Sequence, residues 1–446
     1  MYIQRDVDFI LTAWKQERNR KPILLRGVRQ CGKTSSVRSL AESFENYIEI
    51  NFEKQPAVSS LFAGDIDINK IVRQLELRYD QVIIPGKTLL FIDEIQQCPR
   101  AITALRYFYE DMPELHVIAA GSLLEFVLNN KKKPIDFPVG RIRSVYMYPF
   151  SFMEFLRGIG KSNLFEYLTH LDVWNEENLV HNQLLEVYKE FLIVGGMPEA
   201  VLKYSETGSF LQCRDIHRDI LTSFKDDFNK YDSAVPADTI RKVFDYAIHN
   251  VCKQTKASSA IEGVNAYYFD ECVRLLKRAG LIFPVKASPC DSLPLGATEK
   301  ESNKKLIAFD SGVYLTECGL DTSDIFAAKV FDDLNKGDVV EMQTGLELIK
   351  YSASTSEAVL HYWYRTGANA ETDYVISLDE KVAPIEVKAS KKGSMQSMRS
   401  FIELHQNCSF GIRVSLETFS KYENIIVYPV YAVSKISKSY DFVQKS

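Results

Sequence analysis

Residues 22–34 read PILLRGVRQCGKT, and this stretch decides the fold of the N-terminal part of the chain. Its apolar beginning, at 22–26, predicts a buried strand, and the pattern that starts at Ser35 predicts a helix. The residues between them, 27–34, fit G-x-x-x-x-G-K-[ST] in full. Glycines let backbone N–H groups wrap around an anion, and the N-terminus of the following helix favours negative charge. The stretch therefore predicts a phosphate-binding loop between a strand and a helix.

Each part of this loop has an expected role. Lys33 is placed to put its charge on the β- and γ-phosphates of a nucleotide, and the Thr34 hydroxyl is placed to bind Mg²⁺. ATP and Mg²⁺ are therefore the expected ligands. The residues predicted to bind the nucleotide are Gly27, Val28, Arg29, Gln30, Cys31, Gly32, Lys33 and Thr34.

A second motif ends another apolar run. Residues 88–94 read TLLFIDE, which places Asp93 and Glu94 at the carboxyl end of a predicted strand, where ligands bind in open α/β sheets. We expect Asp93 to hold the metal ion through a water and Glu94 to act as general base toward the attacking water. Two acids can also simply end a strand, but the loop at 27–34 favours the catalytic interpretation.

Two further side chains are candidate catalytic residues. Residues 115–122 read LHVIAAGS, in which Ser122 comes after the apolar residues of a predicted strand. Ser122 would either sense the γ-phosphate or belong to a turn that ends the strand. Arg141 precedes the predicted strand 143–148. It would either stabilise the charge of phosphoryl transfer, in its own or a neighbouring subunit, or be an ordinary surface arginine.

The composition excludes several classes of protein. A chain of 446 residues predicts two or three domains of roughly 150 residues. Its 46% hydrophobic and 25% charged residues are typical of a globular protein and exclude a disordered chain, a coiled coil and a collagen-like rod. A formal net charge of −5 means that a nucleic acid would have to be met by a local basic patch.

The chain is expected to be cytoplasmic. Asp6 and Asp8 interrupt the segment that a signal peptide would keep apolar. No stretch approaches the about 18 uncharged apolar residues of a membrane-spanning helix. The eight cysteines lie far apart without a C-x-x-C pair, so reduced thiols are expected rather than a zinc cage or a disulfide framework.

The C-terminal part carries a second polar pattern. Asp373 opens the predicted strand 372–378, and Glu386 and Lys388 share one face of the predicted strand 383–389. This is the D…E-x-K arrangement of metal-dependent nucleases, in which Asp373 and Glu386 would bind Mg²⁺ and Lys388 would orient or deprotonate water. Glu341, on the preceding predicted helix, is a fourth candidate. A charged, solvent-facing hairpin is the alternative.

The combination of motifs resembles a known family. GVRQCGKT, LLFIDEIQ, VIAAGSLLEF, PVGRIRSVYMYPFSFMEFL and GGMPEAV together resemble the AAA-superfamily P-loop ATPases of bacteria and archaea that carry a C-terminal domain of unknown function. The resemblance covers nearly the whole chain. It implies an α/β fold with four parts: an AAA-type P-loop core with a parallel sheet, a helical lid, a winged-helix-like region and a restriction-endonuclease-like α/β domain. We place them at 1–150, 151–232, 233–330 and 331–446, respectively.

The region expected to be winged-helix-like is a weak candidate for DNA contact. Residues 236–287 predict three helices and a wing, and residues 288–305 predict a loop. The last helix, 267–279, carries basic residues in its second half but Asp270 and Glu271 in its first, the half that a recognition helix presents to DNA. Protein docking or core packing is therefore the favoured role.

Three functions remain open at this point. The leading one is a Mg²⁺-dependent ATPase that acts as a molecular switch on an unknown partner. The alternative is an ATP-regulated DNA-binding protein or metal-dependent nuclease, and the third is a non-catalytic module that holds nucleotide for stability. Partners other than ATP would be an unidentified protein, DNA through the C-terminal half, or a second copy of the chain. No membrane partner is expected.

Overall fold

Five parallel strands form the core of the first of two units into which the chain divides. Their order in the sheet is β2-β3-β4-β1-β5, and every neighbouring pair is parallel. This confirms the predicted α/β fold, and each strand lies within about two residues of its predicted position. The strands are β1 (Ile23–Gly27), β2 (Asn46–Asn51), β3 (Thr88–Asp93), β4 (His116–Ala120) and β5 (Arg143–Met147).

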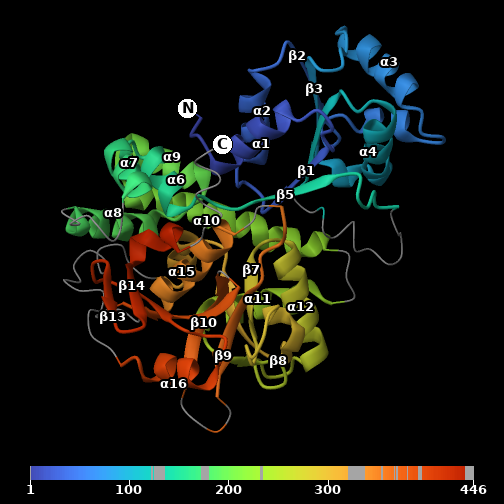
Figure 1. Ribbon diagram of the computed structural model, residues 1–446. Helices are drawn as coiled ribbons and strands as arrows, with labels where there is room; N and C mark the ends of the chain where they lie inside the picture. Colours follow the sequence, from blue (N-terminus) through green and yellow to red (C-terminus); the bar gives the residue numbers. More distant parts are fainter. Residues whose placement is uncertain are drawn as a thin grey trace. The chain divides into compact units, whose positions relative to one another are not determined.

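The structure is a computed structural model, shown in Figure 1. The first unit contains Met1–Tyr148 and two short later segments, and the second contains Pro149–Ser352 and Ala358–Asp441. The residues described are 2–121, 124, 136–171, 180–231, 235–319, 337–352, 355–365, 367, 370–378, 380–389 and 394–436. The candidate Ser122 lies outside these residues.

Helices connect the strands of the first unit. Every residue of β3 and β4 is buried, as expected for strands covered on both faces. Leu24, Leu90 and Phe108 belong to the core that the strands share with the helices. The helices are α1 (Asp6–Gln16), α2 (Lys33–Ala41), η1 (Pro56–Phe62), α3 (Ile68–Tyr79), η2 (Ile95–Gln97) and α4 (Pro99–Asp111).

The second unit begins with helices, as predicted for the residues after 151. Phe152 and Phe155 of the first helix in this region pack against Tyr188 and Phe191 of the third. Ser151 and Glu154 form a capping box at the start of α6. The helices are α6 (Phe152–Gly158), α7 (Ser162–His170), α8 (His181–Val194), α9 (Pro198–Thr207), α10 (Phe210–Asp227), η3 (Phe228–Lys230), α11 (Ala237–His249), α12 (Ala266–Arg278), η4 (Leu295–Thr298), α13 (Ser311–Glu317), α15 (Gly337–Lys350), α16 (Gln396–Leu404) and η6 (Val430–Lys435).

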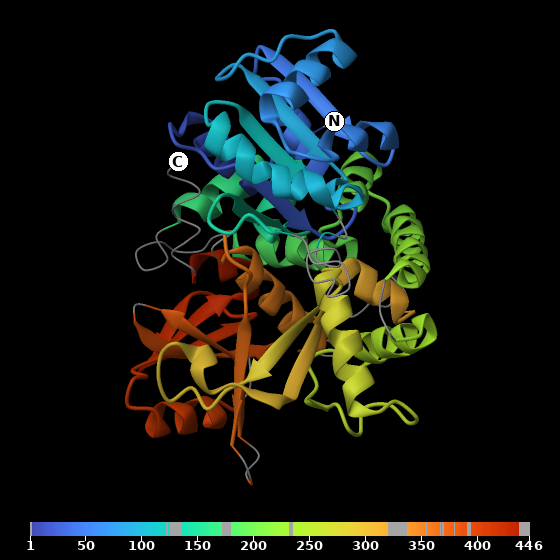
Figure 2. The same ribbon diagram turned by 90° about the vertical axis from the view of Figure 1, so that its right-hand side faces the viewer.

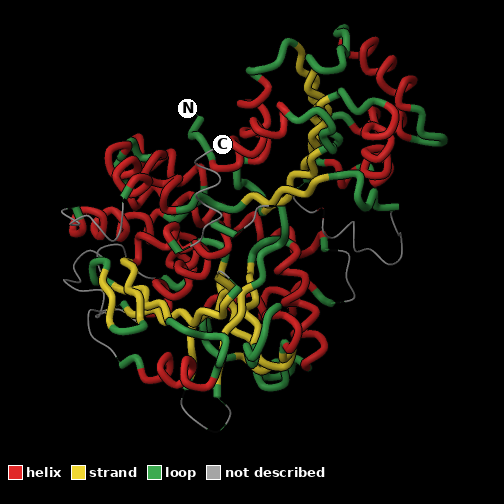
Figure 3. Tube along the Cα trace, viewed as in Figure 1, coloured by secondary structure: helices red, strands yellow, loops and turns green. Residues whose placement is uncertain are grey.

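One nine-stranded sheet runs through the second unit in the order β13-β14-β12-β11-β10-β9-β7-β8-β6. It joins strands from 255–308 to strands from 360–429, and Figures 2 and 3 show the two sets side by side. The two regions expected on either side of residue 330 therefore share one sheet. The strands are β6 (Thr255–Lys256), β7 (Ile282–Ala287), β8 (Lys300–Ala308), β9 (Leu360–Tyr364), β10 (Glu371–Leu378), β11 (Lys381–Lys388), β12 (Gly411–Ser415), β13 (Ser420–Tyr422) and β14 (Ile425–Pro429).

Two local predictions were wrong in this unit. The end of the predicted loop 288–305 belongs to β8, because the apolar strand β7 needs a partner and pairs with it antiparallel. Residues 236–287, all of which are described, contain two helices and not three. The polar stretch 250–265 forms turns and the short strand β6 instead, in keeping with its Ser, Thr and Gly content.

Candidate functional site

The phosphate-binding loop joins β1 to α2, as its sequence predicts. Gly27 has a φ of +148°, and a Cβ atom there would lie 2.1 Å from the carbonyl oxygen of Met147. Gly32 has a φ of +97° and forms the N-cap of α2. Glycine is therefore required at Gly27 both by the backbone angle and by the close approach of β5.

The Lys33 side chain lies over the loop. Its Nζ donates hydrogen bonds to the carbonyl oxygens of Gly27, at 2.9 Å, and of Val28, at 2.8 Å. The residue is buried. Neutral carbonyls are weaker partners for an ammonium group than phosphate oxygens, so a bound phosphate can replace them.

Arg5 supports the loop from behind, which the motif did not predict. Its guanidinium is buried and donates to the carbonyl oxygens of Cys31 and Tyr148, both at 2.8 Å. The two carbonyls belong to the loop and to the segment after β5. Arg5 therefore holds the loop to the edge of the sheet, and a lone arginine near the N-terminus carries no sequence signal for such a role.

Thr34 and Asp93 meet at the carboxyl end of the sheet. The Thr34 hydroxyl donates to Oδ2 of Asp93 at 3.1 Å, and Asn51 of β2 donates to the same oxygen at 3.3 Å. Burial and the neighbouring Glu94 raise the pKa of Asp93. A hydroxyl and a buried carboxylate are the hard oxygen ligands that Mg²⁺ prefers, so this pair fits the predicted metal ion.

Glu94 is held in a special backbone conformation. Its φ is +50°, in the left-handed region, and its Oε2 accepts a hydrogen bond from the buried side chain of Gln96. Gln96 in turn packs against Gly121, where a Cβ atom would lie 2.2 Å from its Oε1. Gln96 therefore orients the predicted general base. Gln96 lies in the motif LLFIDEIQ, but nothing in the sequence distinguishes it from an ordinary polar residue.

Arg141 is engaged elsewhere in the first unit. Its Nε lies 2.8 Å from Oε1 of Glu110 on α4, and its guanidinium lies 6.0 Å from the ring centroid of Tyr109. The hydrogen bond from Arg141 lowers the pKa of the Glu110 carboxyl. A role at a phosphate would require Arg141 to exchange this partner.

The D…E-x-K residues come together in the second unit. Tyr374 of β10 pairs with Ile385 of β11, and the Oδ2 of Asp373 accepts the backbone N–H of Val387 at 2.7 Å. Lys388 Nζ lies 2.7 Å from Oε1 of Glu386, so these two side chains share a face as predicted.

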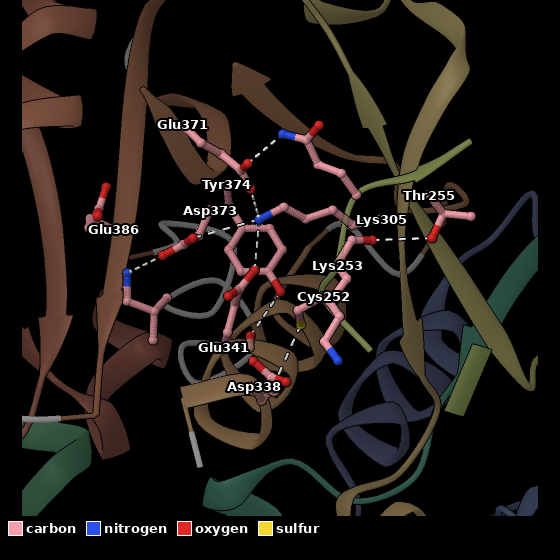
Figure 4. A network of polar contacts seen from close by, with 12 residues as sticks. Cys252, Lys253, Thr255, Lys305, Asp338, Glu341, Glu371, Asp373, Tyr374 and Glu386 are labelled. Atoms are coloured by element: carbon pink, nitrogen blue, oxygen red, sulfur yellow. Dashed lines mark hydrogen bonds and ion pairs between the residues drawn. The ribbon is translucent and has the colours of Figure 1, made fainter. Parts of the chain in front are cut away.

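A buried lysine lies at the centre of this cluster. Figure 4 shows Lys305 of β8 pointing toward Glu341, Glu371 and Asp373. Its Nζ lies 2.9 Å from Glu341 and 3.6 Å from Asp373, and it forms an ion pair with Glu371 as well. The polar residues before Lys305 predict a loop, so the sequence gives no indication of its position in this cluster. We call Lys305, Glu341, Glu371, Asp373, Glu386 and Lys388 the carboxylate cluster.

Two acids of the carboxylate cluster, Glu341 and Glu386, have shifted pKa values. Burial and the charge of Asp373 raise the pKa of Glu341 to about 8 and that of Glu386 to about 7. Burial works against the charge of Lys305, but the neighbouring carboxylates raise its pKa above the ordinary lysine value. The Lys305 ammonium therefore stays charged. The positive charge near Glu341 and Glu386 does not offset the effects of burial and of repulsion by Asp373 on these two acids.

The carboxylate cluster does not fit a metal ion. Among the residues that the structure describes, no three Asp, Glu, His or Cys side chains converge in a way that could hold one. All eight cysteines lie in the described part of the chain, and none of them forms a disulfide there. No helix within the described ranges is long and apolar enough to cross a bilayer.

Three family models match parts of the chain. Residues 19–156 match the family described as AAA domain. Residues 185–324 match "Domain of unknown function (DUF8612)" and residues 336–433 match "Domain of unknown function (DUF4143)". No curated protein matches the chain.

Solved structures resemble the chain distantly. The Walker-type ATPase of Pyrococcus abyssi is 15% identical with a TM-score of 0.43, and the match covers 71% of this chain and 96% of that one. The Aeropyrum pernix Orc1 protein in complex with DNA is 12% identical with a TM-score of 0.31, covering 72% and 93%. Likenesses at this level do not bear on activity. The family match and the geometry of the loop together support an ATP-binding, AAA-type P-loop domain in the first unit.

Proposed function

We propose that the protein is a Mg²⁺-dependent ATPase that works as a molecular switch on an unknown partner. One observation carries this proposal: the hydroxyl of Thr34 lies 3.1 Å from the Asp93 carboxylate, directly beside Lys33 and Glu94. Four residue types with complementary roles in phosphoryl transfer thus meet at one end of a parallel sheet.

The roles of the side chains follow from their positions. Lys33 would exchange the carbonyls of Gly27 and Val28 for the β- and γ-phosphates. Thr34 and Asp93 would hold Mg²⁺, which neutralises phosphate charge when it is bound. Glu94, held by Gln96, would accept a proton from the attacking water.

Arg141 and Ser122 complete the proposed catalytic set. Arg141 would stabilise the transferring phosphoryl group after leaving Glu110, in its own subunit or in a second copy of the chain. Turnover per subunit that depends on protein concentration in the wild type, but not in Arg141→Ala, would show that Arg141 acts on the nucleotide of a second copy. Ser122 stays a proposed sensor of the γ-phosphate.

The test is phosphate release from Mg·ATP by the full chain. We expect Lys33→Ala to weaken ATP binding at least about a hundredfold, since it removes a charged partner of two phosphates. Glu94→Gln should bind ATP as the wild type does and turn it over about 10²–10⁴-fold more slowly. Lys87→Ala, which removes an exposed lysine paired with Glu45, is the control.

Two results would contradict the proposal. One is tight ATP binding by Lys33→Ala, and the other is unchanged turnover by Glu94→Gln. Retained binding without turnover in the wild type would favour a non-catalytic module. Duplex DNA titrated into the same assay separates the partner classes, because turnover that rises with DNA would favour the DNA-binding alternative.

A nuclease in the second unit is the second candidate. It is favoured by the meeting of Asp373, Glu386 and Lys388 on adjacent strands, and it is opposed by the position of the Lys305 ammonium. Metal-dependent DNA cleavage that disappears in Asp373→Ala and in Lys388→Ala would establish it.

A further inference from the structure

We infer that Lys305 is the resident cation of the carboxylate cluster, its ammonium group standing where a divalent metal ion would have to bind. The second unit would then keep the D…E-x-K arrangement without using a metal ion. This inference is independent of the proposed ATPase activity, because it concerns the second unit alone.

The contacts of Lys305 are those of a bound cation. Its side chain is 2% exposed, and its Nζ contacts carboxylates from two elements, Glu341 of α15 and Glu371 and Asp373 of β10. The ring of Tyr362 lies 5.3 Å from the same nitrogen, so an aromatic face closes another side. A lysine removed from water in this way needs acidic partners, and the carboxyl groups of these three side chains supply them.

Other oxygens of the cluster also have hydrogen-bond or ion-pair partners. Oδ1 of Asp373 forms an ion pair with Lys305, and Oδ2 accepts a hydrogen bond from the backbone N–H of Val387. Glu386 gives Oε1 to Lys388, and its Oε2 is buried without a hydrogen-bond partner in the described part of the chain. Most of the carboxylate oxygens that a divalent ion would need are therefore already held by N–H groups of the protein.

Electrostatics makes the two cations mutually exclusive. Mg²⁺ needs oxygen ligands at about 2.1 Å and Ca²⁺ at about 2.3–2.6 Å, so either would lie within a few ångströms of the Lys305 nitrogen. Like charges at that separation in a buried site repel strongly. The lysine is tethered by its own chain, so it is present at every metal concentration and does not pay the entropy of binding.

The inference assigns the cluster a structural role. Lys305 comes from β8, which the sequence places before residue 330, whereas Glu341 and Asp373 come after it. The ion pairs thus clamp α15 and β10 to β8, in the way that structural metal ions join segments distant in sequence.

The experiment measures Mn²⁺ binding by the nucleotide-free full chain, with electron paramagnetic resonance counting the bound ions. We expect the single variant Asp373→Asn to bind as many Mn²⁺ ions as the wild type, because the carboxylate cluster of the wild type binds none. Lys305→Gln should gain one Mn²⁺ per chain, and the double variant Lys305→Gln/Asp373→Asn should lose it again. Thermal unfolding should show a lowered midpoint for Lys305→Gln that Mn²⁺ partly restores.

Lys304→Gln is the matched control. It removes the same charge one residue away, where Lys304 pairs with Asp270 of α12 at 2.6 Å, and it should gain no Mn²⁺. If Lys305→Gln does not fold, the comparison of wild type with Asp373→Asn still decides the question.

Three results would overturn the inference. The first is Mn²⁺ bound by the wild type and lost in Asp373→Asn. The second is a folded Lys305→Gln variant that gains no Mn²⁺. The third is metal-dependent DNA cleavage by the wild type that requires Asp373. None of these depends on whether ATP is hydrolysed.

Discussion

The two polar sites of this chain use a buried lysine in opposite ways. Lys33 rests on two neutral carbonyls, at 2.9 and 2.8 Å, whereas Lys305 contacts three carboxylates. A hydrogen bond to a carbonyl is easily exchanged for one to a phosphate, but breaking a buried ion pair leaves an uncompensated charge. A buried lysine whose partners are neutral carbonyls can therefore exchange them for a bound anion. A buried lysine that is paired with acids has a structural role instead.

The sites also differ in how the chain builds them. The phosphate loop needs one continuous stretch, 27–34, with strand β1 before it and helix α2 after it. The carboxylate cluster takes its members from β8, α15, β10 and β11. A local site can be disturbed by one backbone change, whereas a cluster of this kind should respond mainly to changes of charge.

Gly27→Ala should have the largest effect and would test the local character of the first site. The new Cβ would lie 2.1 Å from the Met147 carbonyl oxygen at a φ of +148°. We expect a loss of about 3 kcal/mol or more in the free energy of unfolding, together with loss of ATP binding. Chemical denaturation and nucleotide binding measure the two effects.

Gly64→Ala is the control for this change. Gly64 also has a positive φ, +72°, but no atom lies within 4 Å of its added Cβ. It should cost only about 1–2 kcal/mol and leave ATP binding intact. Equal effects of the two variants would show that strain alone, and not the approach of β5, makes Gly27 necessary.

The pH dependence of stability should come next in size and should reside in the carboxylate cluster. Glu341 has a pKa of about 8 in the folded chain and about 4.3 when unfolded. The folded state therefore keeps a proton that the unfolded state releases, so stability falls as pH rises from about 4.5 to about 8. We expect a decrease of a few kcal/mol over this range.

Denaturant unfolding at several pH values, in Glu341→Gln and wild type, measures this contribution. Gln cannot ionise, so the variant should lose most of the decrease, whereas Glu403→Gln, at an exposed position of α16, should keep it. If the free energy of unfolding of Glu341→Gln decreases with pH as steeply as that of the wild type, another acid of the cluster is responsible.

Gln96→Ala should have a smaller effect, confined to catalysis in the first unit. Gln96 orients Glu94 without belonging to the phosphate loop. We expect kcat for ATP to fall about tenfold, equivalent to about 1.4 kcal/mol, with the ATP dissociation constant unchanged. Gln97→Ala, at the exposed neighbouring position, should match the wild type. A parallel loss of binding would mean that Gln96 supports the loop itself.

Glu371→Gln should give the smallest change. Glu371 is the most exposed of the three partners of Lys305, and Glu341 and Asp373 remain when its charge is removed. We expect a loss of about 1 kcal/mol or less in the free energy of unfolding, measured by urea denaturation. A loss as large as that of Lys305→Gln would show that the three carboxylates do not share the lysine.

The phosphate loop and the parallel sheet could be read from the residues because their signals are local. A complete motif at 27–34 lies between an apolar run and a helical pattern, and Asp93 and Glu94 end a run buried on both faces. The pairing of Asp373 with the E-x-K strand was also within reach, because a hairpin brings neighbouring segments together.

Lys305 and Arg5 were beyond reach for a common reason. Each acts on residues that meet it only after folding: Glu341 is 36 positions away from Lys305, and Tyr148 is 143 positions away from Arg5. The stretch before Lys305 is polar, so nothing in it predicts the strand that pairing with β7 imposes.

The amino-acid order thus predicted the chemistry of the first site, since a glycine-rich loop before a helix presents backbone N–H groups and a helix N-terminus to a phosphate. It also supplied the acids and lysines of the second site. The fold alone determined which lysine faces which acid, because burial and strand register bring Lys305 to Glu341 and Asp373. That choice turns a pattern typical of metal-dependent nucleases into a cluster with its own cation.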